Sequence, residues 1–306
     1  MSLTDQLTSI TRNHIVPKMY DNIFDSNPTL AKFKSSGRYV TQNGGTTIDI
    51  PLNYAQTTSS GWFSGTETLQ TADNENITKA SYSWKSAYAN ISVAEEDKLK
   101  NGGDLGVIKL LASKAMIAEK TLADILGTGI FSDGTTAKSI VGLRDLVATS
   151  ETVGGISQST SSWWAGNVDS TTTTLTISAM NTQFQNATIG SDAPDYIVTT
   201  RALYNLFYNL LQPQQRFLDK DMAKAGFTSL MFNSAPVTID SHCTAAHMFM
   251  LNMKYLGLYY HPERNMYASE YMKPINQEVL VSRILWMGAL TSSNNRMHAK
   301  LSAITA

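Results

Sequence analysis

Two stretches in the first third of the chain alternate hydrophobic and polar residues with a period of two. The first is GGTTIDIPLNY, which starts at Gly44, and the second is ITKASYSWKSAYANISV, which starts at Ile77 after a polar tract. This alternation is typical of strands with one covered face. We therefore expect a long two-stranded hairpin with a wide tip. Because a lone hairpin is only marginally stable in water, we expect it to lie on another surface.

The tip of this hairpin contains two adjacent aromatic residues, Trp62 and Phe63, in the stretch SSGWFSGTE. The surrounding glycines and serines predict a loop, and a solvated ring contributes nothing to the stability of such a loop. Two explanations remain open. Either the rings are buried against another surface that the tip meets, or they fold back on their own hairpin.

The clearest helix is predicted for residues 104–126. Asp104 can cap its start, and Gly127 with Gly129 is expected to end it. A helix of this length is a rod of about 35 Å, which is long for a compact domain. One apolar stripe follows the helical period, through Ile108, Leu111, Ala115, Ala118, Leu122 and Ile125.

The first residues predict a shorter amphipathic helix followed by an extended arm. Residues 5–24 place apolar side chains at near-helical spacing, and Pro17 breaks the run. The apolar side of this segment needs a partner surface.

The second half of the chain, beyond a Ser/Thr/Gly-rich tract, has an α/β pattern and predicts a second domain. We expect a helix over about residues 175–187, a strand at 196–200 and the helix RALYNLFYNLL, closed by Pro213. Further strands are expected in SAPVTID and AHMFMLNMKYLGLYY. The C-terminal stretch predicts a pair of strands about a turn at 292–295, which must pair with strands already placed.

The composition limits the classes of partner. Only 16% of the residues are charged, against about 25% in an average soluble domain. This suits a protein whose faces are covered by neighbours, or a secreted protein. The net charge of −1 and the scattered lysines and arginines do not make the basic face that a nucleic-acid binder needs. The start does not resemble a signal peptide, and the single cysteine excludes an internal disulfide, so we expect folding in a cytosol.

Two polar clusters are candidate sites of chemistry. The stretch DSHCTAAHM lacks a fourth closely spaced zinc ligand and predicts a loop followed by a buried strand. The stretch GLYYHPERNMYASE predicts an exposed turn or an ion pair with a neighbour. No nucleotide-binding, nucleophile-elbow or zinc-protease motif occurs, and the glycines of TVGGIS do not lie between a strand and a helix. We therefore expect no enzymatic activity, cofactor or metal. The candidate residues in these two clusters are Asp240, His242, Cys243, His247, His261, Glu263, Arg264 and Glu270.

The order of these parts carries a resemblance over nearly the whole chain. An arm is followed by the hairpin with SGWFSGTETL at its tip, by the long helix in EEDKLKNGGDLGVIKLLASKAMIAEKTLADIL, and by an α/β segment with DAPDYIVTTRALYNL. A β-rich end with FNSAPVTID and MLNMKYLGLYY completes the order. This arrangement resembles the major capsid proteins of tailed bacteriophages, which have the HK97 fold.

The resemblance implies an α+β fold with four parts. Residues 1–43 would be an N-terminal arm, residues 44–88 the extended loop, and residues 141–270 an α/β axial domain. A peripheral domain would consist of residues 89–140 and 271–306, with residues 104–126 as its spine helix. The terminal strands would return beside the strand at residues 87–93.

The resemblance also implies a structural role. Copies of the chain would assemble in the host bacterial cytoplasm into the hexamers and pentamers of an icosahedral phage head, enclosing double-stranded DNA that they contact weakly and without sequence specificity. Partners would be a separate scaffolding protein, suggested by the absence of a long helical segment before the arm, and a portal, with decoration proteins as a further option. The expected inter-subunit contacts of the extended loop are Trp62, Phe63, Glu67, Lys79, Tyr82 and Lys85.

Alternatives remain open at this point. An encapsulin-like nanocompartment or another phage structural protein would have a related fold, and a hydrolase would need a pocket around His242, His247 or His261. The type member of the family crosslinks a loop lysine to a neighbour's asparagine with the help of a glutamate. Lys79 and Lys85 are available, but no asparagine or glutamate can be matched, so we expect no crosslink.

Overall fold

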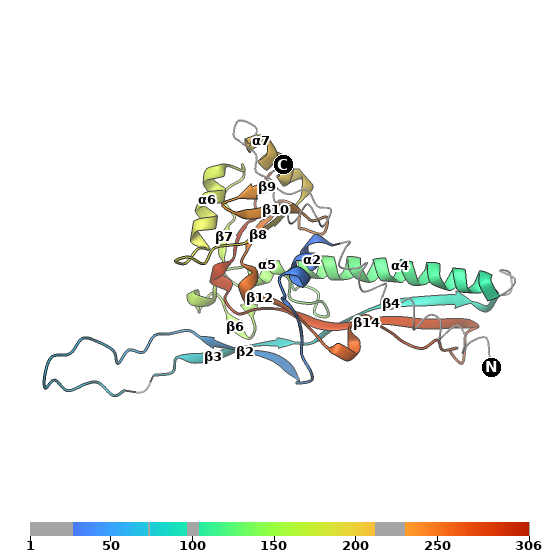
Figure 1. The fold of residues 1–306 in the computed structure, drawn as a ribbon, viewed down its shortest axis with the longest axis horizontal. Helices are drawn as coiled ribbons and strands as arrows, with labels where there is room; N and C mark the ends of the chain where they lie inside the picture. The colour runs from blue at the N-terminus through green and yellow to red at the C-terminus, as the bar shows by residue number, and fades with distance from the viewer. Residues whose placement is uncertain (1–26, 73, 97–103, 212–229, 306) are drawn as a thin grey trace.

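The computed structural model describes residues 27–305, except residues 73, 97–103 and 212–229. The predicted helix at residues 5–24 and Pro213 lie outside the described residues. The described strands form a five-stranded sheet, a six-stranded sheet and two small two-stranded sheets. In Figure 1 the six-stranded sheet stands above one end of a long helix, and a narrow hairpin projects away from the opposite side.

The five-stranded sheet is built around one long strand, β14 (Val279–Ser292). Its first ten residues pair antiparallel with β4 (Lys85–Ala94), from Val279 opposite Ala94 to Gly288 opposite Lys85. This confirms that a C-terminal strand returns beside residues 87–93. The remaining strands of the sheet are β1 (Tyr39–Thr41), β12 (Leu256–Tyr260) and β13 (Tyr267–Ala268).

Helix α4 (Asp104–Ile130) lies along this sheet, beside β4 and β14 (Figure 1). The predicted stripe is buried at Leu111, Ala115, Ala118 and Leu122, and β4 buries Ala89, Ile91 and Val93 in alternation. Ile125 is 42% exposed and Leu126 is buried in its place, so the stripe is wrong at its C-terminal end. The side chain of Ile108 lies outside the described part.

The expected end of the helix at Gly127 is wrong, because α4 continues through both glycines to Ile130. A Cβ at Gly127 would lie 2.5 Å from Nδ2 of Asn27 and 2.7 Å from the ring of His242. At Gly129 a Cβ would lie 3.1 Å from the side chain of Ile140. Gly127 therefore permits close packing within a helix rather than ending the helix.

The six-stranded sheet has the order β7-β15-β11-β8-β10-β9. Helices α6 and α7 pack on it and bury, among others, Met180, Phe184 and Phe207 in a second hydrophobic core. The elements are α6 (Ile177–Asn186), α7 (Arg201–Leu211), β7 (Asn167–Asp169), β8 (Tyr196–Thr199), β9 (Leu230–Phe232), β10 (Ala235–Ile239), β11 (Met248–Leu251) and β15 (Ala299–Leu301).

The sheets divide the chain differently from the predicted domain ranges. Strand β12, from the predicted axial range 141–270, belongs to the five-stranded sheet, and β15, from the predicted peripheral range 271–306, belongs to the six-stranded sheet. The predicted C-terminal strand pair is therefore split, with β14 in one sheet and β15 in the other. Alternation identifies a strand but does not reveal which sheet the strand joins.

The predicted arm, residues 1–43, is built into the subunit where the structure describes it. Helix α2 (Pro28–Ser35) is capped by the side chain of Asn27 and buries Leu30 and Phe33. The strand that follows, β1, pairs parallel with β12. Residues 27–41 therefore complete the subunit's own core and sheet.

The projecting hairpin consists of β2 (Thr47–Asn53) and β3 (Ile77–Ser83), paired from Thr47 opposite Ser83 to Asn53 opposite Ile77. The return run does not continue as one strand of the hairpin. It breaks at Trp84, whose ring N–H donates to the Gly45 carbonyl at 2.9 Å, and resumes as β4 in the five-stranded sheet.

Short elements complete the described chain, and none of the described helices has the length and apolar character needed to cross a membrane. They are α5 (Leu143–Leu146), β5 (Thr152–Val153), β6 (Ile156–Ser157) and the 3-10 helices η1 (Ser162–Trp164), η2 (Met253–Tyr255), η3 (Pro262–Arg264) and η4 (Asn295–Met297).

Candidate contact surfaces

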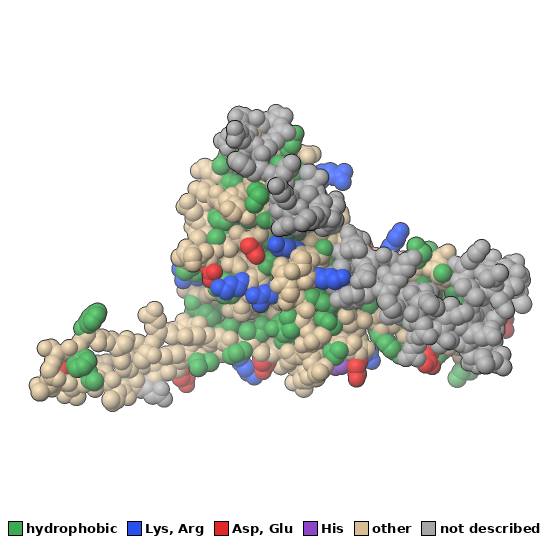
Figure 2. Space-filling view, viewed as in Figure 1, with side chains coloured by type: hydrophobic (Ala, Val, Ile, Leu, Met, Phe, Trp, Pro, Cys, Tyr) green, Lys and Arg blue, Asp and Glu red, His purple; other side chains and the backbone are tan. Residues whose placement is uncertain are grey.

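The tip of the hairpin exposes its two aromatic rings to solvent. Trp62 is 104% exposed and Phe63 is 63% exposed, with Leu69 also exposed nearby. Figure 2 shows hydrophobic side chains on the projecting end, away from the body of the molecule. Trp62 therefore does not fold back on its own hairpin, which removes that explanation for the ring.

Polar side chains hold the irregular tip in place of a strand ladder. The Thr58 hydroxyl donates to Oδ1 of Asn74 at 2.6 Å, and the Ser59 hydroxyl donates to the Ala72 carbonyl at 2.7 Å. Glu67 accepts from the Ser64 backbone N–H through Oε2 at 3.2 Å. The first two bonds join the two sides of the tip and the third lies within the turn after Phe63, so the rings are presented on a defined loop.

Lys79 and Lys85, two of the predicted contact residues, are engaged within the subunit. Nζ of Lys79 lies 2.7 Å from Oδ2 of Asp49 across the hairpin, and this hydrogen bond, together with those from Ser81 and Thr47, lowers the pKa of Asp49 to about 2. Lys85, at the base of the hairpin, donates from Nζ to the Ala137 carbonyl.

Tyr82 lies in the subunit's own core, so its side chain is not available for the inter-subunit contact that the sequence predicted. It is 3% exposed, and its hydroxyl donates to the Ser292 carbonyl at 2.8 Å and accepts from the Ser292 N–H at 3.2 Å. Burial raises the pKa of this phenol. The exposed part of the predicted set is Trp62, Phe63, Glu67 and Lys79.

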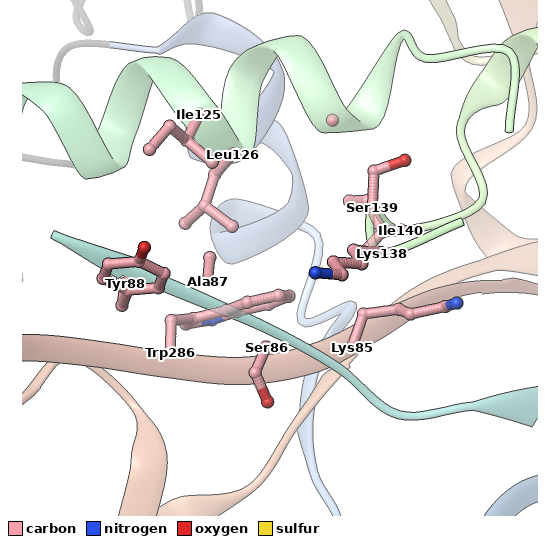
Figure 3. A pocket seen from close by; sticks show the side chains of 11 residues that line it. Lys85, Ser86, Ala87, Tyr88, Ile125, Leu126, Lys138, Ser139, Ile140 and Trp286 are labelled. Carbon is pink, nitrogen blue, oxygen red and sulfur yellow. The ribbon is translucent and has the colours of Figure 1, made fainter. Parts of the chain in front are cut away.

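A second apolar surface lies between α4 and β4 and was not predicted. A cavity of about 270 Å³ opens between these elements, with Ile125 and Leu126 of α4 on one side, Tyr88 and Trp286 across from them, and Lys85 and Lys138 beside it (Figure 3). A second hollow of about 360 Å³ shares Tyr88 and extends along the helix past Ile117.

We call these two hollows together the α4–β4 groove. Its exposed side chains include three large apolar ones, because Ile117 is 62%, Tyr88 61% and Ile125 42% exposed, together with polar ones such as Asn90 and Thr121. Exposed apolar surface of this extent marks an interaction site more often than a free face. The signal in the sequence was the adjacent pair Met116 and Ile117, which lies off the buried stripe of the helix.

The histidine cluster near residue 242 joins three parts of the subunit. Nδ1 of His242 lies 3.1 Å from Oδ1 of the buried Asp240, and Nε2 lies 2.9 Å from Oδ1 of Asp124 on α4. The hydroxyl of Thr29, on α2, donates to the other oxygen of Asp240. The cluster therefore connects α2 and α4 to the loop after β10.

The remaining candidate residues do not form a reactive centre in the described structure. Burial raises the pKa of the Cys243 thiol and lowers the pKa of His247, and no group of three or more metal-ligating side chains occurs among the described residues. The buried strand β11 follows this loop, which confirms that prediction. His261 accepts from the Glu263 N–H at 3.3 Å in the turn η3, where the residues are part of an exposed surface.

No protein-family model and no curated protein matches the sequence. Solved structures do match the fold. The cyanophage A-1(L) capsid asymmetric unit matches with a TM-score of 0.65 at 18% identity, over 88% of this chain and 91% of that chain. The encapsulin complex of Synechococcus elongatus matches at 0.55 and 8% identity, over 89% and 87%. A procapsid of satellite phage P4 that includes a size determination protein matches at 0.53 and 11% identity, over 94% and 90%.

These matches confirm the predicted fold class. The chain has the HK97 fold of phage capsid proteins, in which helices and several sheets are mixed, and the fold extends over most of its length. Encapsulin structures share the fold, so the fold alone does not separate a phage head from a nanocompartment.

Proposed function

We propose that the chain is a structural shell protein that assembles with copies of itself into the head of a tailed bacteriophage. The observation that carries the proposal is the fully exposed Trp62 beside Phe63 on a hairpin that projects from the body. Two large rings in solvent are unfavourable in an isolated subunit and become favourable when a second copy buries them.

The α4–β4 groove is the receiving surface that we propose for these rings. It lies on the main body, whereas the rings lie at the end of the hairpin, so one copy cannot easily satisfy both surfaces by itself (Figure 1). The contact between the tip of one subunit and the groove of the next is heterologous. Heterologous contacts generate a closed ring when the rotation from each subunit to the next adds up to a full turn. Hexamers and pentamers are closed rings of this kind.

The burial of the two rings stabilises this contact but is not sufficient for a stable interface. Full burial of each ring contributes about 1.5–3 kcal/mol. A stable interface buries about 1,600 Å² in total, which is more than two rings supply. Further contacts between subunits must therefore share the stabilisation, and the exposed Glu67 and Lys79 are candidates beside the rings.

The charge of the chain fits a container for DNA. A net charge of −1 offers little attraction to phosphates, so packaged DNA would be contacted weakly and without sequence specificity. We place the protein in the virion after assembly in the host bacterial cytoplasm. A scaffolding protein, a portal and decoration proteins are proposed partners, and the satellite phage procapsid that includes a size determination protein is a precedent for the first.

The second candidate function is an encapsulin-like nanocompartment, favoured by the match to the encapsulin. Such a shell would hold a cargo protein in place of DNA. Pulling down assembled particles and identifying their contents separates the two candidates, because a phage head precursor would contain scaffold or DNA and a nanocompartment would contain one enzyme. A purely enzymatic role would require activity that is lost on substitution of His242, His247 or His261 while assembly stays intact.

The test of a shell function is direct. The chain is expressed alone and with a candidate scaffold from neighbouring genes, and the product is measured by light scattering and negative-stain microscopy. We expect closed particles of uniform size. A chain that stays monomeric at every concentration, salt and scaffold ratio would overturn the proposal.

A further inference from the structure

The glycine pair in TVGGIS forms a turn that touches the projecting hairpin. Strands β5 and β6 pair as a small hairpin, with Gly154 and Gly155 at its end. Both glycines have positive φ, at 60° and 80°. The sequence alone assigned this turn no function.

The turn is fixed to the body at its base. The ring N–H of the buried Trp164 donates to the Val153 carbonyl at 3.0 Å. The side chain of the buried Gln158 donates to the Leu146 carbonyl of α5 at 3.1 Å. These bonds make the turn a rigid part of the body rather than a free loop.

The end of the turn presses on strand β3 of the hairpin. The Ser81 N–H donates to the Gly154 carbonyl at 2.9 Å. A Cβ at Gly154 would lie 2.7 Å from Cβ and 3.2 Å from Cα of Ala80, which is completely buried. A Cβ at Gly155 would meet nothing within 4 Å. Of the two glycines, only Gly154 is in close contact with the hairpin.

A second contact supports the hairpin near the same place. The ring of Tyr54, which follows β2, stacks on Trp163 with centroids 5.4 Å apart and planes inclined by 29°. Trp163 is adjacent to the Trp164 that anchors the turn. The hairpin is thus held on β3 by a backbone contact and next to β2 by an aromatic contact, in addition to the hydrogen bonds between Tyr82 and Ser292. At the tip, the hydrogen bonds of Thr58, Ser59 and Glu67 stay within the hairpin.

We propose that the turn at Gly154 is a bracket that sets the direction of the projecting hairpin. The close approach of Gly154 to Ala80 fixes how near the base of the hairpin lies to the body. A small tilt at this base becomes a larger displacement at the tip, which carries Trp62, because the tip lies beyond the far ends of β2 and β3 (Figure 1). The consequence for assembly rests on the proposed shell function, but the bracket itself is a property of the single subunit.

The experiment measures the direction of the hairpin in unassembled subunits. Spin labels are attached at Ser60→Cys on the tip and Ser178→Cys on α6, in a Cys243→Ala background, and the distance distribution between them is recorded. Ser60 and Ser178 are both exposed. We expect a single narrow distribution for this parent and a shifted or broadened one after Gly154→Ala.

The matched control is Gly155→Ala. Both substitutions place alanine at a positive φ, so both share the backbone strain, but only the substitution at Gly154 adds a methyl group against the hairpin. Gly155→Ala should leave the distance distribution unchanged. The double variant Gly154→Ala with Ala80→Gly relieves the clash and should restore the parent distribution. Equal distributions for the two single glycine variants would overturn the bracket.

A second variant covers the case in which Gly154→Ala does not fold. Ala80→Gly alone removes the methyl group on which the turn presses and should broaden the distribution. An unchanged distribution would overturn the proposal. Particle assembly is scored separately: a bracket confirmed by the labels together with a chain that never assembles would refute the shell function and leave the bracket standing.

Discussion

The exposed rings at the hairpin tip lead to a sharp prediction, namely that Trp62→Ala with Phe63→Ala weakens assembly without affecting the folded subunit. Both side chains are exposed in the subunit, at 104% and 63%. Substitutions at such positions usually change the free energy of unfolding by no more than about 0.5 kcal/mol. Burial of both rings in a neighbour's groove would contribute about 3–6 kcal/mol for each contact.

This energy corresponds to roughly two to four orders of magnitude in the association constant of one contact, since about 1.4 kcal/mol is a factor of ten. The assay has two parts. Thermal unfolding of the unassembled subunit should give the same midpoint for the variant and the parent. Light scattering against concentration should show assembly only at much higher concentration, or none. Trp62→Phe retains a ring and should recover most of the assembly.

The receiving surface is tested in the same assay. Ile125→Ala, in the α4–β4 groove, should weaken assembly while the subunit stays folded, because Ile125 is 42% exposed. If Trp62 packs near Ile125, the effects of Trp62→Ala and Ile125→Ala will not be additive. A tip variant that unfolds the subunit, or that assembles like the parent, would refute the proposed role of the rings.

Four further substitutions and one gel test give additional predictions. Tyr82→Phe should destabilise the subunit by about 1–3 kcal/mol, measured by urea unfolding, because it leaves the buried N–H and carbonyl of Ser292 without their partner. Gly127→Ala should destabilise it by about 1–3 kcal/mol through overpacking, despite the better helix propensity of alanine, whereas Gly129→Ala should be milder. Burial lowers the pKa of His298 from 6.5 to about 3. Between these two pH values the unfolded chain binds a proton that the folded chain does not bind, so the subunit loses stability as the pH falls from 6.5 towards 3. In His298→Gln the slope of unfolding free energy between pH 6 and 4 should therefore be smaller by about 1.4 kcal/mol per pH unit. Boiled, denatured particles should run as a single band at the 33.5 kDa of the chain, and a ladder of multiples would reveal crosslinking.

Much of the fold could be predicted because local patterns set it. The alternation from Thr47 and the long apolar stripe of α4 identified the hairpin and the helix. The order of elements then identified the fold, which the solved structures confirm. The loop around Trp62 was also predicted, but the sequence left open whether its ring folds back on the hairpin, and only the structure shows that it is exposed.

The errors arose where a residue is determined by a distant partner. Tyr82 alternates like its neighbours, but its hydroxyl binds Ser292, 210 positions later in the chain. Gly127 looked like a helix end, but its role is set by Asn27 and His242, which pack against it from two other segments. The α4–β4 groove likewise depends on Trp286 of β14 as its floor, and no local pattern places that ring beneath the helix.

The late position of β14 in the chain bears on the timing of biosynthesis. On the ribosome the adhesive hairpin tip emerges early, whereas Trp286 at the floor of the groove and the central strand of the five-stranded sheet emerge only after residue 279. Strand β15, which joins β7 to β11, emerges later still. Nascent chains on one messenger RNA would thus expose the hairpin tip long before the α4–β4 groove that receives it has formed. The order of synthesis itself would protect crowded polysomes from premature polymerisation.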